Sequence, residues 1–336
     1  MRSLRITGSG TYELLELPTP EPGMGELLLA PMAVGICATD LELLDGSMVY
    51  LRTERTRLPL TPGHEWAATV VEIGDAVTGF VLGDLVVGEC SIGCGVCETC
   101  QEGAYHRCAR RRETGIMNLD GALAERMVFP ARSAHRVPAG VSPLDAALVE
   151  PLAVAYRAVQ RSGPQPGQAV LVVGAGTIGL LVTEILGTLP DVSAHVLEPN
   201  EHRQHLAEVL GAARCHPAQV FDHVIEASGS PAGLGAAYMH LAPGGRLVLV
   251  GLTGEPFLPL PVDEVVVNDQ ELVGSLGSPG VWPQVLAMLA ESHMKPCELV
   301  THQFPLAEFD AAVALATQKL PTTGKIVILP SGVSRG

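Results

Sequence analysis

Four cysteines lie close together in the chain, at a spacing typical of a closed metal site. They are Cys94, Cys97, Cys100 and Cys108. Structural Zn²⁺ is held by four thiolates in a tetrahedron, and a Cys-x-x-Cys step places two sulfurs on one tight turn. We therefore predict a zinc-binding lobe at about residues 90–110. The spacing alone also admits an iron–sulfur cluster or free thiols, but nothing in the neighbouring sequence suggests electron transfer.

Three further places carry polar residues in apolar surroundings. They hold Cys37, Thr39 and Asp40 in the first, His64 and Glu65 in the second, and Glu150 in the third. A catalytic zinc takes about three protein ligands and keeps one position open. One cysteine, one histidine and one glutamate supply such a set, although each alone is as readily a buried core residue. Beside the other motifs, they favour a second, catalytic metal site.

A glycine-rich turn follows an apolar strand and opens a helix. The glycines are Gly174, Gly176 and Gly179, and an acid, Glu198, ends the next strand. The first glycine permits the tight turn, the second lets a pyrophosphate approach the helix N-terminus, and the third lets helix and strand pack closely. Glu198 can accept hydrogen bonds from ribose hydroxyls and disfavours a 2′-phosphate, which favours NAD over NADP. Arg203 could weaken this preference, and a packing turn without a ligand is the alternative.

The character of the chain changes at about residue 146. Residues 1–145 hold short apolar runs separated by Gly and Pro, typical of an antiparallel, barrel-like β domain. Strands then alternate with helices, which predicts a doubly wound parallel sheet. We expect strands at Ala169–Val173, Ser193–Leu197, Phe221–Ala227 and Arg246–Val250, and helices at Ala146–Arg161 (bent by Pro151), Thr177–Leu189 and Glu201–Leu210.

Two features modify this plan. The stretch from Gly211 to Phe221 is short for a parallel crossover, so the strand at Ala213–Cys215 and its following helix should be reduced to a stub. The tail, with helices at Pro279–Ala290 and Leu306–Leu320 and a strand at Lys325–Leu329, should pack back on the first domain. The predicted domains are therefore residues 1–145, 146–275 and a returning segment, 276–336.

Composition excludes several kinds of partner. The 336 residues carry a formal charge of −15, and aromatic residues make up only 4%. Such a surface repels phosphate backbones and anionic lipid, so we expect neither nucleic acid nor membrane partners. The N-terminal residues lack an apolar signal segment, and the clustered cysteines fit metal ligation in a reducing cytoplasm.

Over nearly its full length the chain resembles the zinc-containing medium-chain dehydrogenases, especially the branch of sorbitol, threonine, glucose and aminocyclitol dehydrogenases. The motifs that carry the resemblance are Gly-Ile-Cys-x-Thr-Asp, Gly-His-Glu, the four-cysteine lobe, Glu-Pro-Leu-Ala, the glycine turn and Gly274-Ser-Leu-Gly277-Ser. The resemblance implies an α/β protein in which a GroES-like, β-rich catalytic domain joins a Rossmann domain.

The resemblance also implies roles for individual residues. Cys37 and His64 would bind the catalytic zinc, with Glu150, Glu65 or both in turn as the carboxylate ligand. Thr39 would pass the alcohol proton outward, and Asp40 would hold the His64 ring. The cofactor would contact Ile178, Glu198, Arg203 and backbone near Val250–Leu252 and Leu276–Ser278. Many relatives carry a histidine where this chain has Glu42, so Glu42 or water would continue the proton relay.

The implied activity is reversible, NAD-linked oxidation of a secondary alcohol to a ketone, on a polyol, sugar or aminocyclitol. The segment Asp45–Thr61, with Tyr50, Arg52, Arg55 and Arg57, would lie near the substrate or form a solvated loop. The alternatives are a non-catalytic NAD-binding member and a zinc-free enone or quinone reductase, whose lack of the cysteine lobe speaks against it. The resemblance implies a homodimer or homotetramer, with a small-molecule alcohol or ketone as substrate.

Overall fold

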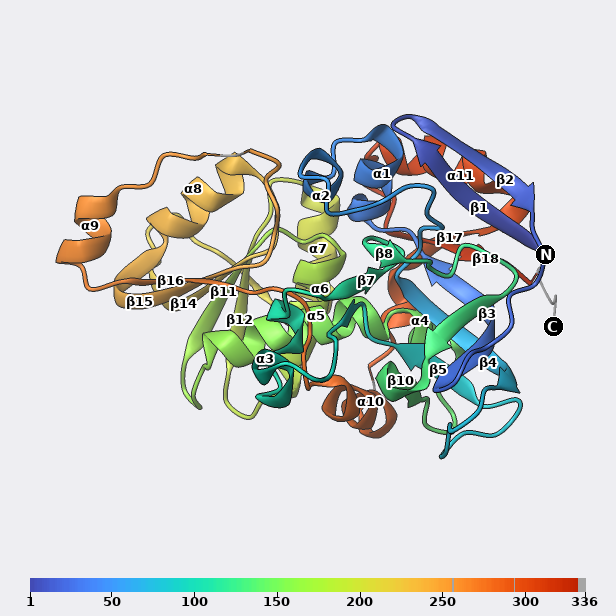
Figure 1. The fold of residues 1–336 in the computed structure, drawn as a ribbon. Coiled ribbons are helices and arrows are strands. Elements are labelled where there is room, and N and C mark those ends of the chain that lie inside the picture. The colour runs from blue at the N-terminus through green and yellow to red at the C-terminus, as the bar shows by residue number, and fades with distance from the viewer. Residues whose placement is uncertain (256, 293, 332–336) are drawn as a thin grey trace. The chain divides into compact units, whose positions relative to one another are not determined.

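The computed structural model describes residues 1–255, 257–292 and 294–331. The chain divides into two compact units (Figure 1). Unit 1 comprises Met1–Glu150 and Ser278–Gly336, and unit 2 comprises Pro151–Gly277. Among the described residues, no helix combines the length and the apolar character that crossing a membrane requires.

A seven-stranded sheet forms the centre of unit 1. Its order is β10-β5-β4-β3-β18-β17, and β9 also pairs with β3. The bounds are β3 (Glu26–Gly35), β4 (Glu65–Ile73), β5 (Leu85–Gly88), β9 (Met127–Pro130), β10 (Ala134–Arg136), β17 (Val300–Pro305) and β18 (Lys325–Leu329). Strand β3 is buried almost throughout, which explains its continuous apolar run. Strand β18 comes from the tail and lies antiparallel to β3, with Val327 opposite Gly35.

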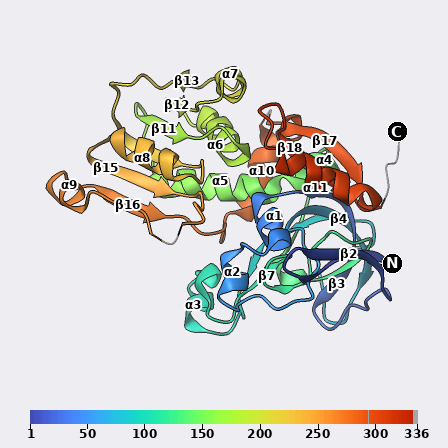
Figure 2. The same ribbon diagram turned by 90° about the horizontal axis from the view of Figure 1, so that it is seen from above.

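Smaller elements surround this sheet. A hairpin joins β1 (Arg2–Gly8) to β2 (Thr11–Glu16), and a three-stranded sheet joins β6 (Ser91–Ile92), β7 (Arg112–Thr114) and β8 (Asn118–Leu119). The helices of unit 1 are α1 (Ala38–Asp45), α2 (Val49–Arg52), α3 (Glu98–Gln101), α4 (Pro143–Ala147), α10 (Trp282–Glu291) and α11 (Phe309–Thr317). Figure 2 shows α11 beside β17 and β18, which it contacts.

Unit 2 is built on a six-stranded parallel sheet of order β13-β12-β11-β14-β15-β16. The strands are β11 (Ala169–Val173), β12 (Ser193–Leu197), β13 (Ala213–Arg214), β14 (Phe221–Glu226), β15 (Leu241–Leu249) and β16 (Glu271–Gly274). Its helices are α5 (Val149–Ser162), which starts in unit 1, α6 (Thr177–Thr188), α7 (Glu201–Val209), α8 (Pro231–Met239) and α9 (Val262–Val267). The strand order reverses between β11 and β14, and such switch points are where doubly wound sheets bind ligands.

The α/β fold class is confirmed, and β11, β12 and β18 have the predicted bounds. The reduced connection is confirmed as well, since β13 has two residues and no helix lies between it and β14. The single bent helix at 146–161 is wrong. The chain forms α4 and α5 with a break at Leu148, and Pro151 lies in the first turn of α5, where its missing N–H is tolerated.

Candidate active site

The four predicted lobe cysteines meet at one point in unit 1. The sulfurs of Cys94, Cys97, Cys100 and Cys108 all lie within 4.8 Å of one another. Two of the separations are 3.9 Å, between Cys94 and Cys100, and 3.7 Å, between Cys97 and Cys108. A zinc–sulfur bond of about 2.3 Å gives a tetrahedron with an edge of about 3.8 Å, whereas a disulfide needs about 2.05 Å. The four thiols therefore fit a tetrahedral metal and not a pair of disulfides.

Local backbone structure presents these sulfurs to one another. Cys97 precedes α3, and Cys108 follows a 3₁₀ turn at Tyr105–Arg107. The backbone N–H of Arg110 donates to the Cys108 sulfur at 3.3 Å, and its guanidinium donates to Cys94 at 3.2 Å. A backbone hydrogen bond from Val96 lowers the pKa of Cys94 to about 6. A backbone hydrogen bond from Cys100 lowers the pKa of Cys97, but the neighbouring thiols of Cys100, Cys94 and Cys108 raise it to about 11.

A second cluster of ligand atoms lies elsewhere in unit 1. Atoms of Cys37, His64 and Glu65 all lie within 4.8 Å of one another. Cys37 caps the start of α1, while Glu65 begins β4 and pairs with Gly35 of β3. His64 and Glu65 are buried, and Cys37 is half-buried. Adjacent strands thus bring together residues that lie far apart in the sequence.

Asp40 is fully buried and braces this second cluster. One carboxylate oxygen accepts the Cys37 backbone N–H at 2.9 Å. The other accepts the Gly63 N–H at 3.2 Å and lies 3.5 Å from His64 Nδ1. Burial lowers the pKa of His64, but Asp40 and then Cys37 raise it well above its ordinary value. Among the described residues, His64 Nδ1 is buried without a hydrogen-bond partner. Asp40 and Cys37 therefore favour a positive charge at the His64 ring, and a bound metal cation would supply one.

Glu150 is a buried carboxylate beside this cluster and not within it. Burial raises its pKa to about 7, with His64 lowering and Glu65 raising it. Within the described part of the chain, no hydrogen bond or ion pair reaches its carboxylate, although the side chain is only 8% exposed. A buried, unpaired carboxylate is costly unless a cation offsets its charge. The structure therefore groups Glu65 with Cys37 and His64, and leaves Glu150 nearby without a partner.

Lys325 is a site residue that sequence reasoning missed. It begins β18, its ammonium lies 2.8 and 2.7 Å from the two carboxylate oxygens of Glu65, and it also donates to Ile36 O at 3.2 Å. Burial lowers the pKa of Lys325, but Glu65 raises it above its ordinary value, so the ammonium keeps its charge. A lone lysine in the apolar run Lys-Ile-Val-Ile-Leu was the available signal.

Cys90 does not follow the spacing of the four lobe cysteines. In the structure it lies near the cluster of Cys37, His64 and Glu65. It is buried, and its backbone carbonyl accepts the Thr114 N–H at 2.9 Å. Burial raises the pKa of its thiol well above the ordinary value, and the nearby charge of His64 lowers it. Cys90 therefore lines the surroundings of His64 as a protonated, apolar side chain.

The predicted proton relay and substrate segment also lie in unit 1. Thr39 is half-buried in the first turn of α1, and Glu42 follows one turn later on the same face. Burial, followed by Asp45, raises the pKa of Glu42. The Tyr50 hydroxyl accepts a hydrogen bond from Arg111 at 3.0 Å, and the Arg55 guanidinium lies 4.9 Å from the Tyr50 ring centre.

In unit 2 the three glycines occupy distinct environments. Gly174 has φ of 94°, and a Cβ there would lie 2.8 Å from the Ser228 backbone. Around a Cβ at Gly176 there is open space, and no side chain caps the α6 helix that follows. A Cβ at Gly179 would collide with Gly174 O. The turn therefore offers an uncapped helix N-terminus that backbone or anion can approach closely.

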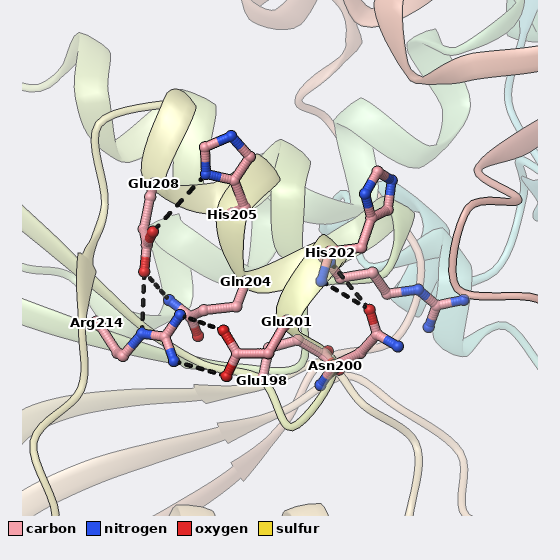
Figure 3. A network of polar contacts seen from close by, with 9 residues as sticks. Glu198, Asn200, Glu201, His202, Gln204, His205, Glu208 and Arg214 are labelled. Atoms are coloured by element: carbon pink, nitrogen blue, oxygen red, sulfur yellow. Dashed lines mark hydrogen bonds and ion pairs between the residues drawn. The ribbon is translucent and has the colours of Figure 1, made fainter.

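Glu198, for which a ribose contact is predicted, binds two backbone N–H groups in the structure. It follows β12, and its two oxygens accept the N–H groups of Ala175, at 2.8 Å, and Asn200, at 2.9 Å. Asn200 in turn caps α7 by accepting the Arg203 N–H at 3.1 Å. Figure 3 shows Glu198 and Asn200 at the start of this helix. Glu198 therefore also fixes the glycine turn, because Ala175 lies between Gly174 and Gly176.

Arg214, in β13, forms ion pairs with two glutamates of α7. Its guanidinium lies 2.8 Å from Glu201 and 3.0 Å from Glu208, as Figure 3 shows. Since Arg214 belongs to β13, these ion pairs tie the two-residue strand to the helix.

Known proteins resemble both units. The model of the alcohol dehydrogenase GroES-like domain matches residues 23–139, and that of the glucose dehydrogenase C-terminus matches residues 145–323. An L-threonine 3-dehydrogenase of Saccharopolyspora erythraea is 31% identical, covering 98% of this chain and 98% of that protein. A sorbitol dehydrogenase of Halalkalibacterium halodurans is 29% identical over 91% of this chain and 92% of that protein.

A solved structure agrees with these relatives. A Sinorhizobium meliloti 1021 protein classed as a zinc-binding dehydrogenase and bound to NADP has a TM-score of 0.90 and 26% identity, covering 98% of this chain and 99% of that chain. The chain belongs to the zinc-containing medium-chain alcohol dehydrogenases. This dehydrogenase is an oxidoreductase that acts on the CH–OH group of a small molecule.

The remaining cofactor residues predicted for this dehydrogenase are spread over both units. Ile178 is the second residue of α6, Val250 follows β15, and Leu252 and Leu276 are exposed in unit 2. Ser278 belongs to unit 1, where it is buried and its hydroxyl accepts the Trp282 indole N–H at 3.2 Å. The Ser278 hydroxyl is therefore already engaged with a residue of its own unit, although its O–H donor is not used by that contact.

Proposed function

We propose that the chain catalyses the reversible, NAD-linked oxidation of a secondary alcohol to a ketone. One zinc ion would be held by Cys37, His64 and a glutamate, and a second by the four-cysteine lobe. The observation that carries the proposal is the meeting of a thiol, an imidazole and a carboxylate within 4.8 Å, beside the Glu150 carboxylate, which has no partner in the described part of the chain.

The donor set of the second cluster fits a catalytic zinc. A thiolate, a neutral imidazole and one carboxylate leave a fourth position open. Asp40, close to His64 Nδ1, would hold the ring so that Nε2 is the ligand atom. When bound, the zinc supplies Lewis acidity, which lowers the pKa of an alcohol hydroxyl.

The protein itself must move the hydroxyl proton outward. Thr39 is the nearest hydroxyl in the sequence to Cys37, at the start of α1. We assign it the first transfer, with Glu42 or water taking the proton onward. A Glu42 carboxyl whose pKa is raised is a better acceptor than an ordinary glutamate. Overall, the alcohol loses one proton to this relay and one hydride to the cofactor, giving ketone and NADH.

The glycine turn of unit 2 would bind the dinucleotide. Its uncapped helix N-terminus suits a pyrophosphate, and the space around Gly176 admits one. NAD supplies the hydride acceptor. Glu198 disfavours a 2′-phosphate, which supports NAD over NADP, although one relative of known structure binds NADP. Among the described residues the Arg203 guanidinium has no ion-pair partner, so its charge is the feature that could admit NADP.

We propose a polyol, sugar or aminocyclitol as the substrate. Support comes from the relatives named for L-threonine and sorbitol. It also comes from the polar group formed by Tyr50, Arg55 and Arg111, which suits a hydroxylated molecule. A homodimer or homotetramer remains a prediction, which light scattering of the purified protein decides.

The direct test is Cys37→Ser, with Cys215→Ser as a matched control outside both clusters. NADH production is measured over a panel of secondary alcohols, and zinc is counted per chain. We expect Cys37→Ser to lose roughly a thousandfold or more in kcat and one of two zinc ions, and Cys215→Ser to keep both. Full alcohol oxidation by Cys37→Ser would show that the catalytic zinc is assigned to the wrong residues.

A further inference from the structure

We propose that Lys325 decides which of two glutamates serves as the carboxylate ligand of the catalytic metal. By holding Glu65 in an ion pair, Lys325 leaves Glu150 as the ligand. This inference rests on the zinc site proposed above, and it makes Lys325 a positioning residue, since it acts through Glu65.

The contacts of Lys325 use its ammonium completely. An ammonium has three N–H donors, and three acceptors surround this one: Glu65 Oε1 at 2.8 Å, Glu65 Oε2 at 2.7 Å and Ile36 O at 3.2 Å. The side chains are 5% and 2% exposed, so water does not share the pair. Ile36 precedes Cys37, and Glu65 follows His64. One ammonium therefore fixes the residues adjacent to both other ligands.

The neighbouring backbone is shaped for this position of Glu65. Gly35 lies opposite Glu65 across the β3–β4 pair, and a Cβ on Gly35 would collide with Glu65 Oε2. A residue with a side chain would push the carboxylate off Lys325. Glycine at this point is thus part of the same arrangement.

The charges favour Glu150 as the ligand. If Glu65 turned to a metal, the Lys325 ammonium would stay buried without its counter-ion, which is strongly unfavourable. Asp40, the other nearby carboxylate, is already occupied by the backbone N–H groups of Cys37 and Gly63. Glu150 gives up no hydrogen bond among the described residues when it binds a cation. The metal therefore offsets the charge of a buried carboxylate that has no partner among the described residues.

The test is a double-mutant cycle on zinc affinity at the catalytic site. Glu150→Gln is made alone and together with Lys325→Met, and the dissociation constant is measured by competition with a chelator. Alone, Glu150→Gln should weaken binding roughly a hundredfold or more. With Lys325→Met, Glu65 is released to bind, so the same change should cost less than about tenfold. Equal losses in the two backgrounds would overturn the proposal.

Two further variants separate the outcomes. Adding Glu65→Gln to the double variant should restore the full loss, because the substitute ligand is gone. Glu65→Gln combined with Lys325→Met, which removes both charges of the pair so that neither is left buried alone, should change zinc affinity less than about threefold and leave the Co²⁺-substituted absorption spectrum as in the parent. A loss beyond tenfold would make Glu65 the resident ligand and refute the role of Lys325. If the parent binds zinc only in the four-cysteine lobe, the proposed function fails instead.

Discussion

The two ligand clusters of unit 1 differ in how many positions around a metal their own side chains can fill. In the lobe, four equivalent sulfurs face one another, and backbone and Arg110 donors reach two of them. In the other cluster the donors are of three kinds, His64 Nδ1 has no hydrogen bond among the described residues, and Glu65 is already held by Lys325. Four sulfurs leave no open position on a metal in the lobe, whereas the second cluster leaves one position for a substrate.

This difference separates a structural from a catalytic role. Four thiolates complete a tetrahedron and leave no position for a substrate, so the lobe can only stabilise the fold. A mixed set with three ligands leaves one position open. Loss of a ligand should therefore reduce stability in one cluster and turnover in the other.

The largest expected effect is on turnover, at Glu150. Glu150→Gln should lower kcat by roughly a thousandfold, because it removes the carboxylate proposed as a zinc ligand. Steady-state kinetics and metal analysis check this, with the exposed Glu13→Gln as control. An unchanged kcat in this variant would show that the second cluster has no larger effect on turnover than the lobe.

The lobe should respond in stability. Cys97→Ser should lose one zinc and about 3 kcal/mol of folding free energy, which corresponds to a Tm lower by on the order of 10 °C. Differential scanning calorimetry measures this change. A variant that keeps its Tm and loses only activity would contradict a structural role for the lobe.

A third effect is the pH dependence of the metal-free protein. Burial raises the pKa of Glu150 to about 7 from its usual 4.5. The folded state then binds more protons than the unfolded state between these values, so stability is full below the lower pKa and falls as pH rises through the upper one. We expect about 2.5 kcal/mol less stability at pH 8 than at pH 5 from this group. Urea unfolding at both values measures it.

In Glu150→Gln this part of the pH dependence should vanish, so the variant is the control for other titrating groups such as His64. Zinc should remove it too, by binding the ionised carboxylate. Parallel pH curves for the metal-free parent and the variant would contradict the burial of an unpaired Glu150.

The smallest expected effect lies in unit 2, outside both clusters. Glu198→Gln should lower the preference for NAD over NADP by about tenfold, since it removes the charge that opposes a 2′-phosphate. The ratio of kcat/KM for the two cofactors checks this, and metal content should not change. An unaltered ratio would indicate that Glu198 serves only to fix Ala175 and Asn200.

Sequence reasoning succeeded where local pattern decides the structure. The apolar runs of β11 and β12 and the spacing of the lobe cysteines are local features, and the structure has them as predicted. The helix break at Leu148 was missed because helical periodicity continues across it. Lys325 and Glu65 lie 260 residues apart, so only the pairing of β18 with β3 brings them together. The Gly-His-Glu motif alone therefore could not show that the Glu65 carboxylate is paired with Lys325.

Anomalous diffraction at the zinc edge tests the central claim most directly, on crystals of the protein as purified. The account predicts two zinc peaks in each chain, one enclosed by the four lobe sulfurs and one within bonding distance of Cys37, His64 and Glu150. A single peak in the lobe, with no metal near Cys37 and His64, would contradict it.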